Sequence, residues 1–67
     1  MTITAQSNAS QRTKNRIREN GTEFHFMNQA TFKGSGLLQG RECVLVQAPR
    51  TEWVGWLPLD EIIGELK

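Results

Sequence analysis

The chain has 67 residues, of which 22% are charged, and a net charge of +1 at pH 7. This length admits one small domain, and the charge balance by itself indicates neither a nucleic-acid-binding nor a membrane-surface protein. A single cysteine, Cys43, excludes an intrachain disulfide. No segment has the apolar core of a signal peptide or the roughly 20 apolar residues of a membrane span, so we expect a cytoplasmic protein without membrane contact.

The first ten residues are predicted to be a disordered arm. They are mostly Thr, Ser, Asn, Gln and Ala, and they show no hydrophobic periodicity. Only five of the 25 hydrophobic residues lie in the first 21 positions. We therefore expect an arm over residues 1–10 and a single small domain over residues 11–67. A folding unit of this size is near the limit of what one core stabilises, which favours self-association or a permanent partner.

A short helix is predicted over residues 11–20, with Ser10 as its N-cap and Gly21 just after its last turn. Only Ile17 offers an apolar contact, so this helix needs docking to exist. The helix is basic, because the first 18 residues hold four positive side chains and no acid, namely Arg12, Lys14, Arg16 and Arg18. These four are the candidate residues for binding an anion or a nucleic acid.

Five short strands are predicted after the helix. The first two are TEFHFMN and ATFKG, separated by a turn at NQ or NQA, and a glycine-rich connection follows over residues 33–40. The run ECVLVQA predicts a central strand that is buried on both faces, with Cys43 as a small buried side chain. TEWVGWLP is the fourth strand and ends at Pro58, and LDEIIGEL contains either a short helix or the last strand. The economical architecture is mainly β, a small, strongly bent five-stranded barrel behind a short N-terminal helix.

The segment from Gly55 to Ile62, GWLPLDEI, resembles the C-terminal signature of Src-homology-three domains. The resemblance implies that Pro58 closes a strand, that one 3₁₀ turn follows, and that Ile62 opens the final strand. The family's ligand-binding tyrosine is replaced by Glu61, and the chain contains no tyrosine at all. The resemblance therefore implies the barrel and does not imply a groove for proline-rich peptides.

Two further resemblances concern larger parts of the chain. A short helix followed by a bent five-stranded barrel is similar to the architecture of Sm-like proteins, whose subunits form rings. The segments KNRIRENG and GWLPLDEI together are similar to short proteins of marine cyanobacteria and their phages, a likeness that implies no activity.

The two tryptophans, Trp53 and Trp56, are three positions apart, and this odd spacing places them on opposite faces of a regular strand. Either Trp56 lies in the core with Val54, or Trp53 lies in the core with Leu57 and Trp56 marks a contact surface. The second face is then covered by the N-terminal helix, a second subunit or a ligand. The candidate interaction surface consists of Trp53, Trp56, Pro58 and Glu61.

The sequence offers little catalytic chemistry. His25 and Cys43 are 18 positions apart, and no cysteine–histidine cluster or phosphate-binding loop is present. Asp60 and Glu61 are adjacent acids on a turn, and we expect both to be solvated. We therefore predict no enzyme, no cofactor and no metal. The predicted function is a non-enzymatic barrel module for protein–protein interaction or homo-oligomer assembly, and the alternative is a barrel that binds RNA or single-stranded nucleic acid through the basic arm.

Overall fold

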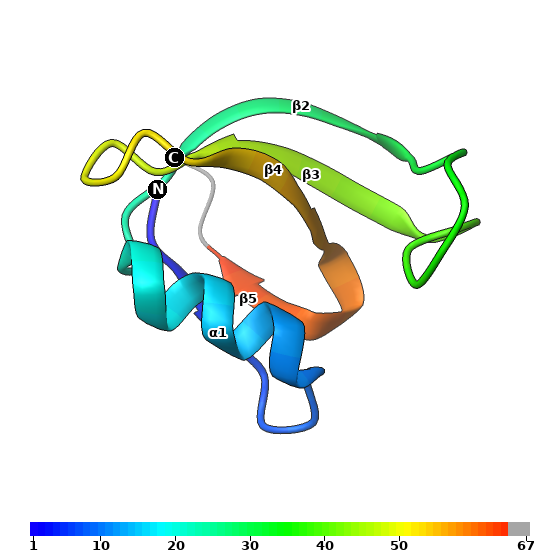
Figure 1. The fold of residues 1–67 in the computed structure, drawn as a ribbon, viewed down its shortest axis with the longest axis horizontal. Coiled ribbons are helices and arrows are strands. Elements are labelled where there is room, and N and C mark those ends of the chain that lie inside the picture. The colour runs from blue at the N-terminus through cyan, green and yellow to red at the C-terminus, as the bar shows by residue number, and fades with distance from the viewer. Residues whose placement is uncertain (65–67) are drawn as a thin grey trace.

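The computed structural model describes residues 1–64 and has one α-helix and five strands arranged in two antiparallel sheets (Figure 1). In chain order the elements are β1 (Ile3–Ala5), α1 (Gln11–Asn20), β2 (His25–Thr31), β3 (Glu42–Gln47), β4 (Val54–Pro58), the 3₁₀ turn η1 (Leu59–Glu61) and β5 (Ile62–Gly64).

The larger sheet has the order β2-β3-β4, and β1 pairs with β5 in a second sheet. The sheets meet where Thr2 bridges Glu23 and where Phe24 donates its backbone N–H to the carbonyl of Met1 at 2.9 Å. Figure 1 shows the larger sheet arching over α1 and β5. The predicted mainly β class is confirmed for the described residues. The predicted barrel is not confirmed, because the two sheets do not close on each other.

Strand β1 lies within the segment that composition predicts to be disordered. Ile3 is fully buried, and it pairs with Gly64 of β5. The prediction missed this strand because a three-residue strand has no periodicity of its own and its pairing partner lies at the far end of the sequence. The helix therefore follows β1 and precedes β2, whereas the sequence predicts it in front of all the strands.

The predicted helix is confirmed over Gln11–Asn20, including both of its ends. The Ser10 side chain accepts a hydrogen bond from the backbone N–H of Thr13, which satisfies one of the free donors of the first turn. Gly21 has φ of 85° and donates its N–H to the carbonyl of Ile17 at 2.8 Å. Glycine adopts this backbone conformation without steric cost, so it ends the helix cleanly.

The turn predicted at residues 28–30 does not form, because β2 runs unbroken from His25 to Thr31. Polar NQA stays in the strand because it pairs with the apolar strand β3, and the only irregularity is a bulge between Phe26 and Asn28. The predictions for the other strands hold. Strand β3 is the central strand of its sheet, and β4 ends at Pro58 before η1 and β5.

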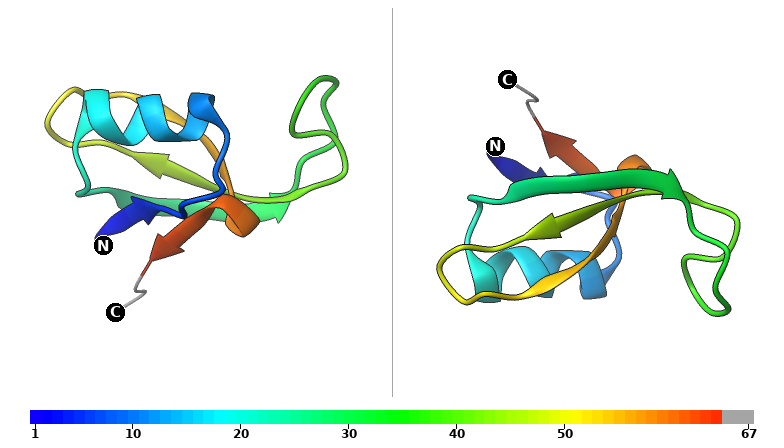
Figure 2. Two further views of the ribbon diagram at one scale, coloured as in Figure 1. Left: turned by 90° about the horizontal axis from the view of Figure 1, so that it is seen from below. Right: turned by 90° about the horizontal axis from the view of Figure 1, so that it is seen from above.

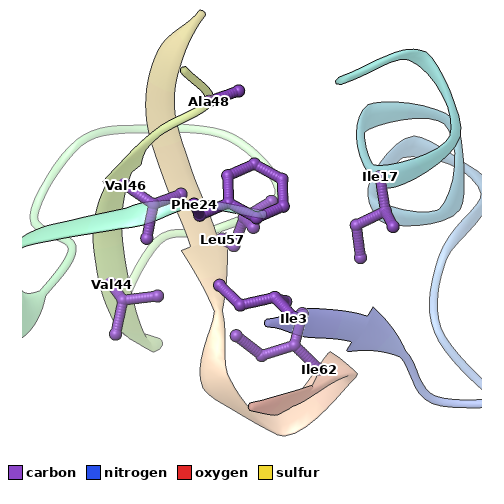
Figure 3. Close-up of a cluster of buried hydrophobic side chains, with 8 residues drawn as sticks. All are labelled: Ile3, Ile17, Phe24, Val44, Val46, Ala48, Leu57 and Ile62. Carbon is purple, nitrogen blue, oxygen red and sulfur yellow. The ribbon is translucent and has the colours of Figure 1, made fainter. Parts of the chain in front are cut away.

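The core lies between the two sheets and α1 (Figure 3). Ile17 of α1 points toward Ile3 and Phe24, so this one apolar residue docks the helix. Cys43 is buried, as predicted. The buried hydrophobic cluster comprises Ile3, Ile17, Phe24, Val44, Val46, Ala48, Leu57 and Ile62.

Candidate interaction surface

Trp56 lies within β4 and Trp53 just before it, and their side chains lie on opposite faces. A side chain at Gly55 would collide with the Trp53 ring, so this ring lies across Gly55 on the face that also carries the fully buried Leu57. Trp53 packs against the core cluster. Trp56 faces the other way, in register with Leu45 of β3. Of the two arrangements open from the sequence, the structure has Trp53 with the core and Trp56 outside.

Helix α1 covers part of the inward tryptophan. The guanidinium carbon of Arg16 lies 5.5 Å from the centre of the Trp53 ring, a cation–π arrangement. The helix therefore lies on the core side of β4, and it does not cover the second face, which carries Trp56.

The outer face of the larger sheet carries partly exposed apolar side chains. Phe32 meets Trp56 edge to face, with 6.0 Å between the ring centres. Leu45 and Trp56 are cross-strand neighbours, and Val54 is 47% exposed. We define Phe32, Leu45, Val54 and Trp56 as the outer sheet surface. Pro58, a candidate contact from the sequence, is fully buried and therefore offers no contact surface.

Strand β2 forms the open margin of the larger sheet (Figure 2). All seven of its residues are exposed, including Phe26 at 46% and Met27 at 52%. No described strand pairs with its outer edge after Phe24, whose backbone N–H is bonded by the Met1 carbonyl. The described chain thus presents one strand that the fold itself does not cover.

Glu61 is the fourth candidate contact, and both of its carboxylate oxygens accept hydrogen bonds from within the molecule. Its Oε1 accepts from the Ser10 backbone N–H at 2.9 Å, the Ser10 hydroxyl at 2.8 Å and the Thr13 hydroxyl at 2.7 Å. Its Oε2 accepts from Arg41 at 2.7 Å. Its side chain is 12% exposed, whereas that of Asp60 is 70% exposed. The expectation that both acids are solvated is therefore wrong for Glu61.

These contacts keep Glu61 ionised. Burial alone would raise its pKa, but the hydrogen bonds from Arg41, Thr13 and Ser10 together outweigh burial and lower the pKa to about 2. The carboxylate lies at the positive end of the helix dipole, where a negative charge is stabilising. Glu61 is therefore a structural anion at the N-terminus of α1.

The opposite end of α1 is held by the β3–β4 connection. Arg50 donates to the Glu19 carbonyl at 2.6 Å and to the Asn20 carbonyl at 3.4 Å. The Thr51 hydroxyl also donates a hydrogen bond to Oδ1 of Asn20. A cation at the negative end of the dipole binds the carbonyls that the helix leaves without partners. Neither Glu61 nor Arg50 shows a local sequence signal for this role, because each lies far from the helix in the chain.

The four basic residues of α1 differ in their surroundings. Arg16 lies over Trp53 and 3.9 Å from Glu19, and Arg18 bonds Asn15 at 2.8 Å. Arg12 shares the helix face of Arg16, and Lys14 is half-buried. Nη1 of Arg12 and Nε of Arg16 are buried and have no hydrogen-bond partner among residues 1–64.

Catalytic residues do not converge in the described part of the chain. His25 lies opposite Gln47 and Cys43 lies opposite Ala30, so the two are at different ends of β3. Burial raises the pKa of the Cys43 thiol, which favours the unreactive thiol form. Residues 1–64 contain no cluster of three potential metal ligands, and no helix among them is long and apolar enough to cross a membrane.

One apolar cavity of about 160 Å³ opens near the ends of β1 and β5. Its walls include Met1, Ile3, Val44, Leu59 and Ile62. No ionisable or nucleophilic side chain is among them, so the cavity has the character of incomplete core packing.

No protein-family model matches the chain, and comparisons with curated proteins and with solved structures gave no significant match.

Proposed function

We propose that the protein is a non-enzymatic small-barrel module, of the Src-homology-three-like or Sm-like kind, that binds other protein through the outer sheet surface and the adjoining strand β2. The observation that carries the proposal is the uncovered face itself. Val54 is half exposed beside the Trp56–Phe32 pair, and β2 has no buried residue. Aromatic side chains surrounded by exposed apolar residues are typical of protein-binding sites.

The barrel class is supported by local features of the two sheets. Strand β4 ends at Pro58, a 3₁₀ turn follows, and Ile62 opens β5, in the order that the Src-homology-three resemblance implies. The bridge between Thr2 and Glu23 links the two sheets along one side. These features support a bent, partly open barrel.

A photo-crosslinking amino acid at Val54 tests the proposal in cells that express the protein. We expect discrete adducts with protein from position 54, identified by mass spectrometry, and none from the matched position Gln11. Gln11 is exposed on α1, away from the outer sheet surface. Equal labelling from the two positions, or no protein adduct at Val54, would contradict the proposal.

A second candidate function is binding of RNA or single-stranded DNA through α1. The unpartnered guanidinium nitrogens of Arg12 and Arg16 favour it, and Arg16 lies over the Trp53 ring. Positive side chains beside an aromatic ring are the combination that binds single strands.

Replacing Arg12, Lys14, Arg16 and Arg18 together by Gln tests this candidate. We expect at least about tenfold weaker binding of a labelled single-stranded RNA at low salt, and a shallower dependence of binding on salt. Lys33→Gln, in the exposed β2–β3 connection, is the control and should bind as the unaltered chain does. If the unaltered chain does not bind RNA at low salt, this function is excluded.

A further inference from the structure

Apart from the bulge between Phe26 and Asn28, strand β2 lacks the devices that usually protect an exposed sheet edge. Such edges are commonly blocked by Lys, by Pro or by a covering element. The seven residues from His25 to Thr31 include no Lys, Arg, Asp, Glu or Pro. β2 is the terminal strand of the order β2-β3-β4, and no described strand pairs with its outer edge between His25 and Thr31. The edge is therefore open to another strand.

The backbone of β2 presents hydrogen-bonding groups along this edge. Phe32 donates its N–H to Arg41 and accepts from Gly40, so its backbone groups face β3. In an antiparallel strand these groups alternate in direction, so those of Thr31 and Gln29 face the open edge. The Gln29 N–H is bonded by the side chain of its own neighbour Asn28 at 2.8 Å. A side chain thus takes the place of the missing strand.

We propose that a second copy of this chain adds to this edge, with its β2 antiparallel to the first. This inference rests on the proposed function and names the partner. The bulge between Phe26 and Asn28 limits regular pairing to residues 28–32. The two-fold axis then passes beside Ala30, so that Gln29 of each copy bonds Thr31 of the other, and two three-stranded sheets form one six-stranded sheet.

The charges of the chain favour a second copy over a charged partner. The net charge is +1, so two copies repel each other weakly. The edge carries no charged side chain with which an acidic or basic strand could form an ion pair. In the proposed register Ala30 faces Ala30, and the Gln29 amide faces the Thr31 hydroxyl. No like charges meet, and the strand is complementary to itself.

A disulfide across the two-fold axis tests the register directly. The two Ala30 residues would form a non-hydrogen-bonded pair, with Cα atoms about 4.5 Å apart, which lies within the range that a disulfide spans. Ala30→Cys is made in a Cys43→Ala background, because Cys43 is the cross-strand neighbour of Ala30 in the same chain. We expect dimers linked by a disulfide under mild oxidation. Thr4→Cys in the same background, exposed in β1, should give none.

Sedimentation analysis of Ala30→Lys and Ala30→Ser supplies a second readout. Like charges directly opposite each other weaken strand pairing, so Ala30→Lys should raise the dimer dissociation constant at least about tenfold. Ala30→Ser should leave it unchanged. If Ala30→Lys does not fold, the inference is tested by the disulfide experiment with Ala30→Cys alone.

The inference is overturned if the unaltered chain stays monomeric at high concentration, or if Ala30→Cys and Thr4→Cys give equal amounts of dimer. In either case a Val54 adduct with a different protein would leave the proposed function standing.

Discussion

Glu61 takes the place that a glutamate of the helix itself fills in a capping box. In that motif the third residue of the helix is an acid that accepts from the N-cap backbone N–H. Here the third residue is Thr13, which donates to Glu61, and Glu61 accepts from the backbone of Ser10. The cap is thus completed by a residue 51 positions away from Ser10 in the chain.

Glu61→Gln should destabilise the protein by about 2 kcal/mol, because it removes charge-assisted hydrogen bonds at a nearly buried position. Asp60→Asn is the matched control, since Asp60 also bonds Arg41 but is mostly exposed. We expect a much smaller loss for Asp60→Asn, because exposed ion pairs contribute little. Urea unfolding at pH 7 measures both. Equal losses would show that the Glu61 contacts contribute no more than a surface pair.

The same carboxylate makes stability depend on pH. Its pKa is about 2 in the folded protein and 4.5 without these contacts, so its contribution is fully present above pH 4.5. The contribution is lost as the pH falls from 4.5 toward 2, because the unfolded chain binds the proton first. Glu61→Gln should flatten the stability profile within this window. A profile as steep as that of the unaltered chain would contradict this assignment.

At the scale of elements, two short segments depend on partners far along the chain. Helix α1 has one core residue, Ile17, and is bound at its ends by Glu61 and Arg50. Strand β1 has three residues and is held by β5 and by the burial of Ile3. Both would be marginal in isolation, since short helices and strands gain most of their stability from tertiary contacts.

Ile3→Ala should cost about 2–5 kcal/mol, because it removes a fully buried side chain from the core between the two sheets. Thr4→Ala changes the neighbouring exposed residue and should alter stability by less than about 0.5 kcal/mol. Thermal unfolding followed by circular dichroism compares the two. If both variants unfold at the temperature of the unaltered chain, β1 does not contribute to the core.

At the scale of the whole molecule, the sequence predicts those features whose signals are local. Ser10 and Gly21 identify both ends of α1, and the apolar run that includes Cys43 identifies β3. The predicted turn at residues 28–30 failed because pairing with β3 outweighs the turn preference of Asn and Gln. The predictions missed β1 and the role of Glu61 because both depend on contacts between distant segments.

The placement of Glu61 also has a consequence for the order of events during folding. Helix α1 and β1 are stabilised by η1 and β5, which lie about 50 or more positions away in the chain, so both elements form late. The strands from β2 to β4 are neighbours in sequence and can pair earlier, because closing short loops costs less entropy. During that interval the basic helix segment is free of its anion, and the inner side of the larger sheet lacks its cover. A folding chain in which Glu61 has not yet reached α1 would therefore be the form most exposed to aggregation or to chaperones.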